Sequence, residues 1–84
     1  MYRYIFSKTA EKDLKKLSRP VQIQIINKLK YFIKSANPLA FASYLKDSQL
    51  GTYRFRIGDY RVIFDIEDEN IIILTLGHRR EIYK

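Results

Sequence analysis

Side chains able to do chemistry are concentrated in two stretches of the sequence. Arg54, Arg56 and Arg61 stand in the run YRFRIGDYRVIF, and the chain ends in GHRREIYK, which contains its only histidine. Guanidinium groups can bind the non-bridging oxygens of a phosphodiester and stabilise the charge that builds up there during displacement. A tyrosine such as Tyr83 can stack on a base, donate to a phosphate or transfer a proton. These residue types therefore predict a site for a phosphodiester.

The spacing of the three arginines places them on one face of a predicted β-hairpin. From residue 53, apolar side chains recur at every second position, and Gly58-Asp59 suits a two-residue type II′ turn. That turn pairs Arg56 directly with Arg61 and leaves Arg54 on the same face. The other face, predicted to be the core, carries Tyr53, Phe55, Ile57, Tyr60, Val62, Phe64 and Ile66.

Two arginines at directly paired positions are unfavourable for folding. Like charges opposed across a sheet destabilise it by roughly a few tenths of a kcal/mol to 1 kcal/mol. Each arginine could instead extend into water or pair with an aspartate, namely Asp47, Asp59 or Asp65. For three arginines on one face, an anion-binding site is the better explanation.

The elements that must position these residues begin with a strand and two helices. Residues 2–6 alternate weakly and predict a short strand. Ser7 is the expected N-cap of a helix that carries an apolar side chain at every third or fourth position. Ser18 is expected to cap a second helix, which has Pro20 in its first turn and is stopped by Asn37-Pro38.

The rest of the chain is predicted to complete a sheet. Residues 38–52 show the weakest pattern and are expected to form a loop held to the core, with room for one helical turn. After the hairpin, a turn at residues 67–70 leads into the run IIILTL, whose two apolar faces are typical of a central strand. Gly77 permits a bend after this strand ends at residue 76, which places His78, Arg79, Arg80 and Tyr83 beside the sheet, with Arg79 and Tyr83 at the rim of the arginine face. The order β-α-α-β-β-β predicts one α+β domain, residues 1–84, with two helices packed on a mostly antiparallel four-stranded sheet.

Composition and charge limit the classes of function. The net charge of +7 and the pI near 9.8 favour an anionic partner such as nucleic acid, an acidic protein or a lipid surface. A solvated lysine-rich surface is the alternative. With no cysteine and one histidine a zinc site is not expected, and no cofactor is predicted. No signal peptide or membrane span is expected, and the absence of cysteine is compatible with the reducing cytoplasm, the predicted location.

At YRFRIGDYRVIF and GHRREIYK the sequence resembles the RelE-like toxins of the RelE/ParE superfamily, over nearly the whole chain. The resemblance implies the microbial-RNase-like fold of RelE and the role of toxin in a type II toxin–antitoxin pair. Toxins of the RelE branch cut messenger RNA in the ribosomal A site without a metal, by attack of the substrate's 2′-hydroxyl on the adjacent phosphate. The partners it implies are an acidic RelB-like antitoxin, the ribosome and messenger RNA.

The resemblance also carries catalytic roles to five residues, Arg54, Arg56, Arg61, Arg79 and Tyr83. Arg61 and Arg54 would hold the scissile phosphate, with Arg56 assisting electrostatically. Arg79 would stabilise the leaving 5′-oxygen. RelE itself has lysines at the positions of Arg54 and Arg56, and arginine cannot serve as a base because it is effectively never deprotonated. Tyr83, or His78 in its place, is therefore the expected base.

Other basic residues are predicted to dock on ribosomal RNA, with a solvated helical face as the alternative for each. They are Lys8, Lys12, Lys15, Lys16, Lys28, Lys30, Lys34 and Arg80. Two other functions stay open. One is that of a ParE-like toxin, which poisons DNA gyrase without cleaving RNA, and the other is a basic nucleic-acid-binding module without catalysis.

Overall fold

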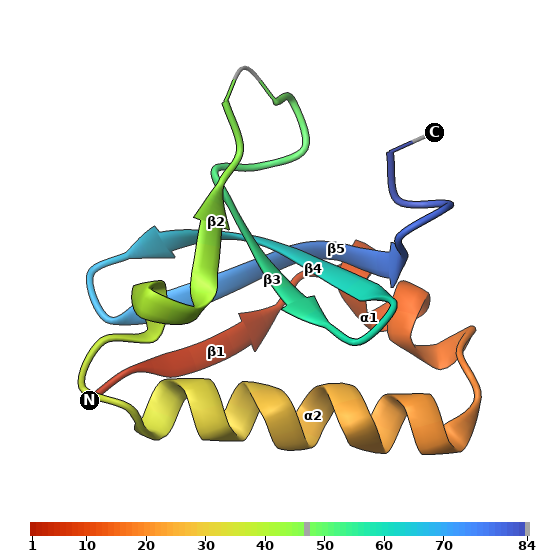
Figure 1. Cartoon of the computed structure of the whole chain (residues 1–84), viewed down its shortest axis with the longest axis horizontal. Coiled ribbons are helices and arrows are strands. Elements are labelled where there is room, and N and C mark those ends of the chain that lie inside the picture. Colours follow the sequence, from red (N-terminus) through yellow and green to blue (C-terminus); the bar gives the residue numbers. More distant parts are fainter. Residues whose placement is uncertain (47, 84) are drawn as a thin grey trace.

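The computed structural model describes residues 1–46 and 48–83, which form two α-helices packed on one face of a five-stranded sheet (Figure 1). In chain order the elements are β1 (Arg3–Phe6), α1 (Lys8–Lys15), α2 (Arg19–Lys34), the 3₁₀ helix η1 (Pro38–Phe41), β2 (Ala42–Tyr44), β3 (Tyr53–Ile57), β4 (Tyr60–Glu67) and β5 (Asn70–His78). The predicted α+β class is confirmed. No helix in this described part of the chain is long and apolar enough to cross a membrane.

The strands lie in the order β1-β5-β4-β3-β2, and only the β1–β5 pair is parallel. The predicted count of four strands was wrong. Within the expected loop 38–52, the helical turn is η1, and β2 pairs with the free edge of β3, Ala42 opposite Phe55 and Tyr44 opposite Tyr53. A strand of three residues is too short to show a period of two, so the sequence pattern did not reveal it.

The two α-helices begin where the sequence predicts. The hydroxyl of Ser7 accepts from the backbone N–H of Ala10 at 3.1 Å and donates to the carbonyl of Leu74 at 2.9 Å, which ties α1 to β5. Ser18 occupies the N-cap position of α2, but its side chain makes no capping bond. The α2 helix ends at Lys34, before the predicted stop at Asn37-Pro38, and the hydroxyl of Ser35 donates to the last-turn carbonyl of Phe32 at 2.7 Å.

The core lies between α2 and the sheet face that the alternation predicted. Four of the seven residues expected there, Phe55, Ile57, Val62 and Phe64, are buried, and Tyr53, Tyr60 and Ile66 pack partly buried around them. A row of rings crosses this core. The ring centroids of Phe32 and Phe55 are 4.5 Å apart, and those of Phe55 and Phe64 are 4.2 Å apart. Burial of these rings is the main source of stability.

The other face of the sheet is only partly covered. A register shift in the β4–β5 pair pairs Ile63 with Thr75 and Phe64 with Ile73, so Leu74 is an additional residue of β5. The β2–β3 loop packs on Ile63 and Leu74 through Gly51, where a Cβ would lie 2.7 Å from the Cγ2 of Ile63. This loop covers one part of the face and leaves the rest for polar side chains.

Candidate phosphate-binding site

The β3–β4 hairpin brings the three arginines onto one face of the sheet, as predicted. Arg56 is paired directly with Arg61, and the turn uses Gly58 at a φ of +59°, as a type II′ turn requires at its first central position. The side chain of Gln24 packs against this turn, 2.9 Å from the place of a Cβ on Gly58. A residue other than glycine at position 58 would therefore disturb both the turn and its contact with α2.

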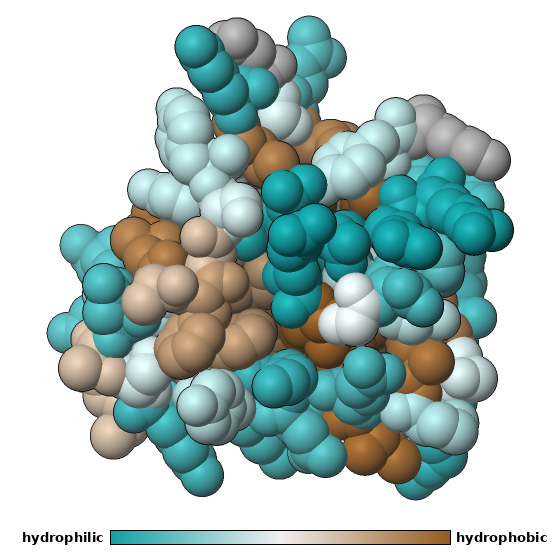
Figure 2. Space-filling view, viewed as in Figure 1, coloured by the Kyte–Doolittle hydropathy of each residue, from teal (hydrophilic) through white to brown (hydrophobic). Residues whose placement is uncertain are grey.

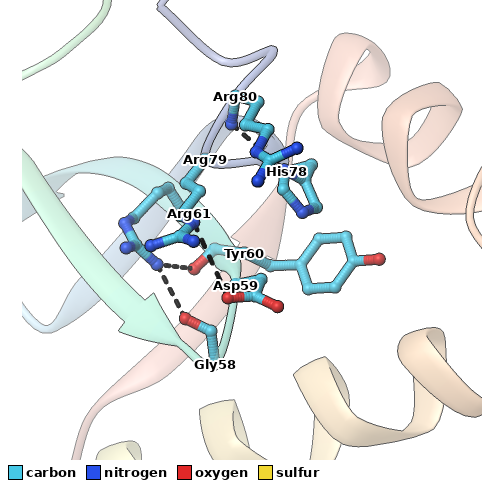
Figure 3. Close-up of polar contacts among 7 residues, drawn as sticks. All are labelled: Gly58, Asp59, Tyr60, Arg61, His78, Arg79 and Arg80. Carbon is cyan, nitrogen blue, oxygen red and sulfur yellow. Dashed lines mark hydrogen bonds and ion pairs between the residues drawn. The ribbon is translucent and has the colours of Figure 1, made fainter.

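Arg61 is the one buried charged residue among those described, with 7% of its surface exposed. Its Nη1 donates to the carbonyls of Gly58 at 2.8 Å and Tyr60 at 2.9 Å (Figure 3). Opposite it in β5 is Gly77, which has no side chain to compete for the space. Burial lowers the pKa of Arg61 from its ordinary value, and the neighbouring guanidinium groups of Arg56 and Arg54 lower it further. A bound anion would relieve this unfavourable environment.

Arg54 connects the hairpin to the end of the chain. Its Nη1 donates to the hydroxyl oxygen of Tyr83 at 2.7 Å, and its guanidinium carbon lies 6.0 Å from the centroid of the Tyr83 ring. The Nε of Arg54 is buried and has no hydrogen-bond partner among residues 1–46 and 48–83. Buried donors without a partner are rare in folded proteins. Because this Nε is closed to solvent, a ligand would meet Arg54 at the exposed Nη1 end of its guanidinium, beside Tyr83.

The segment after β5 folds back on the hairpin. The backbone N–H of Arg79 donates to the carbonyl of Asp59 at 2.7 Å, and the Nε of Arg79 is 3.7 Å from the Asp59 carboxylate. Both side chains are exposed, so this ion pair adds little stability. The N–H groups of Glu81 and Ile82 both donate to the carbonyl of His78, and this turn leads to Tyr83. Arg79 and Tyr83 thus lie at the border of the arginine face, as predicted.

His78 does not join the arginines. The predicted end of the last strand at residue 76 was wrong, because β5 continues through Gly77 to His78, which pairs with Tyr60. Alternation puts His78 on the side of Tyr60 and opposite to that of Arg61. The His78 ring meets the Tyr60 ring edge to face at 5.4 Å, and its Nδ1 accepts from the N–H of Arg80 at 3.1 Å (Figure 3).

The lysines predicted to dock on RNA lie away from the arginine face. All seven are exposed; six lie on α1 and α2, which cover the opposite face of the sheet, and Lys16 directly follows α1. Arg56 and Arg80 are exposed as well. Ser43, which sequence reasoning missed, is paired with Arg54 across the β2–β3 ladder and borders the site. Ser43 could have been identified from the sequence only if β2 had been predicted. Lys84, the last residue of GHRREIYK, and Asp47 lie outside the described residues.

The arrangement supplies four positive groups around one open face: Arg54, Arg56, Arg61 and, at the border, Arg79. Figure 2 shows a strongly hydrophilic surface over β3 and β4 that extends toward the C-terminal segment. Such a set of guanidinium groups can donate hydrogen bonds to both non-bridging oxygens of a phosphate and stabilise negative charge on them. The described residues contain no cluster of three or more His, Asp or Glu side chains that could hold a metal ion.

Comparison with known proteins identifies relatives of this fold and sequence. A family model described as the ParE toxin of the type II toxin–antitoxin system parDE matches residues 4–83. Toxin RelG of Mycobacterium tuberculosis is 32% identical over 85 residues, covering 99% of this chain and 97% of the relative. A chain of the toxin–antitoxin complex RelBE2 from that organism is similar at a TM-score of 0.76 and 30% identity, covering 93% of this chain and 98% of the other.

A second solved structure extends the likeness to archaea. A chain of the RelB–RelE antitoxin–toxin complex of Methanococcus jannaschii has a TM-score of 0.72 and 26% identity, with 94% of each chain covered. The sequence relative is named a toxin, the structural neighbours come from toxin–antitoxin complexes, and the matches extend over nearly the whole chain. The resemblance drawn from YRFRIGDYRVIF and GHRREIYK is thereby confirmed. The chain belongs to the RelE/ParE superfamily of toxins of type II toxin–antitoxin systems.

Proposed function

We propose that this toxin is a ribosome-dependent endoribonuclease that inhibits translation by cutting messenger RNA in the A site. The observation that carries the proposal is the placement of Arg54, Arg56 and Arg61 on one face of the sheet, with Arg54 bonded to the hydroxyl of Tyr83 at 2.7 Å. Guanidinium groups gathered on one face favour an oxyanion ligand, and the relatives with solved structures include RelE toxins in complex with RelB.

The proposed reaction needs groups at three positions around one phosphate. Arg54 and Arg61 hold its non-bridging oxygens, and Arg56 adds positive charge. Tyr83 acts as its phenolate, after losing its own proton to solvent. The substrate's 2′-hydroxyl gives its proton to this oxygen and attacks phosphorus, while the bond from phosphorus to the 5′-oxygen breaks. Arg79 stabilises that oxygen, which then takes a proton from solvent. The products are a 2′,3′-cyclic phosphate and a free 5′-hydroxyl.

Tyr83 is the proposed base because Arg54 already donates to its oxygen at 2.7 Å. A cationic donor at this distance stabilises negative charge on a phenolate oxygen. His78 is the weaker candidate, since its ring lies on the Tyr60 side of the sheet. The arginines supply the positive charge that a metal ion provides in other nucleases, so cleavage is proposed to be independent of transition metals.

The test is cleavage of messenger RNA on programmed ribosomes with mapped ends. Purified toxin is expected to leave a 2′,3′-cyclic phosphate or its 3′-phosphate, with a chelator selective for transition metals present so that magnesium still holds the ribosome together. The second candidate function, gyrase inhibition, is favoured by the ParE description of the matching family model. Intact messenger together with inhibited DNA supercoiling would establish that candidate instead. If the protein binds RNA and does not cleave it, the function would be that of a nucleic-acid-binding module without catalysis.

Conservative variants test the assignment of Tyr83. Tyr83→Phe keeps the ring and removes only the hydroxyl, and it should lower the cleavage rate by about 10²–10⁴, the usual contribution of a general base. Tyr83→Ala is the matched comparison. If Tyr83→Phe cleaves at the wild-type rate and Tyr83→Ala does not, the ring stacks and the base lies elsewhere. His78→Gln should then abolish cleavage, whereas an active His78→Gln protein would exclude His78.

The proposed cellular partner is an acidic RelB-like antitoxin acting in the cytoplasm. Several related toxins were solved with RelB antitoxins, and a toxin with a net charge of +7 fits an acidic partner that folds on binding. Binding of the cognate antitoxin should weaken as salt is raised, but less steeply than RNA binding, because apolar burial carries part of the affinity. Affinity independent of salt would contradict the electrostatic part of this proposal.

A further inference from the structure

Three aromatic rings on α2, η1 and β2 are exposed, and two of them are in contact. Tyr31 of α2 is 59% exposed, Phe41 of η1 is 40% exposed, and Tyr44 of β2 is 68% exposed. The rings of Tyr31 and Phe41 meet edge to face at 5.6 Å, and the Nζ of Lys28 lies 5.3 Å from the centroid of the Tyr31 ring. We call these four residues the aromatic surface. Tyr44 follows Phe41 by three residues along the chain, so β2 extends the exposed pair toward the edge of the sheet. Exposed large rings on a small domain are typical of a binding surface.

The stretch of sequence that contains the aromatic surface carries basic residues and no acidic ones. Residues 14–46 contain no aspartate or glutamate, and their seven basic residues are Lys15, Lys16, Arg19, Lys28, Lys30, Lys34 and Lys46. A lysine beside the Tyr31 ring, in a stretch of chain without acidic residues, favours a partner that is anionic and can also contact aromatic faces. Single-stranded nucleic acid meets both requirements, because its phosphates pair with lysines and every base has a face that stacks.

The aromatic surface adjoins the arginine face at the β2 edge. Ser43 is paired with Arg54, and the next residue, Tyr44, is paired with Tyr53, whose ring centroid is 6.1 Å away. Successive residues of a strand point to opposite faces of the sheet, so Ser43 lies on the face of Arg54 and Tyr44 on the face of Tyr53. The two faces meet at β2 because it is an edge strand. Figure 2 shows apolar surface over η1 and the start of β2 beside the hydrophilic surface of β3 and β4. One strand separates the two regions.

We propose that the aromatic surface is a second RNA subsite, which stacks bases of nucleotides that flank the phosphate held by Arg54 and Arg61. This inference rests on the proposed function of the arginine face and adds the path by which the RNA leaves it, around the β2 edge. An acidic protein segment also fits the charge. The continuity of the aromatic surface with the arginine face favours RNA, since one strand of nucleic acid can occupy both regions at once.

The test compares RNA lengths in a binding assay that does not depend on cleavage. Fluorescein-labelled 2′-O-methyl RNA cannot be cut, because its 2′-oxygen is blocked. The wild-type protein should bind a nonanucleotide more tightly than a trinucleotide in fluorescence anisotropy. Tyr44→Ala and Tyr31→Ala should weaken nonanucleotide binding by about 5- to 150-fold each, the range of base stacking on one ring, and leave trinucleotide binding unchanged.

Matched variants of Tyr44 separate stacking from apolar contact. Tyr44→Phe keeps the ring and should bind the nonanucleotide like the wild type, whereas Tyr44→Leu should behave like Tyr44→Ala. Equal affinity for the two RNA lengths, or no loss in Tyr44→Ala, would overturn the inference. Wild-type RNA affinity in Tyr44→Leu and Tyr44→Ala, with weakened binding of the cognate acidic antitoxin, would do the same and mark a protein interface.

The arginine face is tested separately in the same assay. Arg54→Ala and Arg61→Ala should weaken binding of both the trinucleotide and the nonanucleotide. If neither variant changes trinucleotide affinity, the proposed function of the arginine face is wrong. The dependence on length and on Tyr44 would still be measured independently.

Discussion

The two faces of the β3–β4 hairpin come from the same alternating residues and act in opposite ways. On the face under α2, Phe55 is fully buried between Phe32 and Phe64. On the other face, Arg56 opposes Arg61, and Arg54 keeps a buried donor without a partner among the described residues. The first face stabilises the fold by burial, whereas the second keeps positive charges close together. The difference shows that stability from one face permits an unfavourable arrangement suited to binding on the other.

The largest expected effect is on the buried face. Phe55→Ala should lower the free energy of unfolding by about 3–5 kcal/mol, because it removes a ring that contacts two others and leaves a cavity. A domain of this size has about 5–10 kcal/mol of stability in total. Urea denaturation followed by circular dichroism measures the loss, with Phe55→Leu as a milder control. A loss below about 1 kcal/mol would contradict the comparison of the two faces.

A substitution of Arg61, in contrast to that of Phe55, should lower activity and leave stability nearly unchanged. Arg61→Met keeps much of the volume and removes the charge, so the free energy of unfolding should stay within about 1 kcal/mol of the wild type or rise. Cleavage on ribosomes should fall by about 10²–10³, the usual contribution of one charge-stabilising donor. Strong destabilisation together with lost cleavage would instead assign Arg61 a structural role through its bonds to Gly58 and Tyr60.

Arg56 offers a smaller and purely electrostatic test. Arg56→Gln should raise the free energy of unfolding by a few tenths of a kcal/mol to about 1 kcal/mol, because it removes the like charge opposite Arg61. The gain should shrink as salt is added, since added ions screen charges near the surface. Lys30→Gln, on exposed α2 surface away from the arginines, is the matched control. If both variants change stability equally, repulsion across the hairpin is not the cause.

The smallest effect concerns a carboxylate outside both faces. The N-terminal ammonium of Met1 donates to Glu69, and this bond lowers the pKa of that carboxyl below its ordinary value of 4.5. A lowered pKa in the folded state means that the stabilisation is present above pH 4.5 and is lost as the pH falls through the lowered value. The wild type and Glu69→Gln should therefore differ slightly in urea midpoint at neutral pH and converge in acid. A difference that persists in acid would have another origin.

Local patterns predicted the hairpin and with it the arrangement of the arginines. The period of two from residue 53 and the pair Gly58-Asp59 are enough to place Arg56 opposite Arg61, and the structure has that register. The two helices were predictable for the same reason, since their spacing and caps are local. Features that depend on residues only a few positions apart, such as turns, caps and the side-chain alternation of a strand, could be inferred from the sequence.

Contacts between distant parts of the chain could not be inferred. The carboxylate of Asp13 accepts from the hydroxyl of Thr75 at 2.6 Å and from the backbone N–H of Leu76 at 3.2 Å. Both residues of β5 lie beyond Ile73, where the pairing with β1 ends. No local pattern records such a bond. The side of the sheet on which His78 lies depends equally on how far β5 extends. Predicting a bend at Gly77 therefore placed His78 too close to the arginines.

The position of β5 in the sheet makes assembly of the sheet depend on residues 70–78. This strand is the last of the five in chain order, yet it lies between β1 and β4 and is paired with both. A nascent chain that lacks residues 70–78 cannot join β1 to the β3–β4 hairpin, and it also lacks Arg79 and Tyr83. Pairing between such distant segments forms slowly. A chain that stops before residue 70 therefore cannot form this sheet, and β1 and the β3–β4 hairpin stay unjoined until β5 has been made.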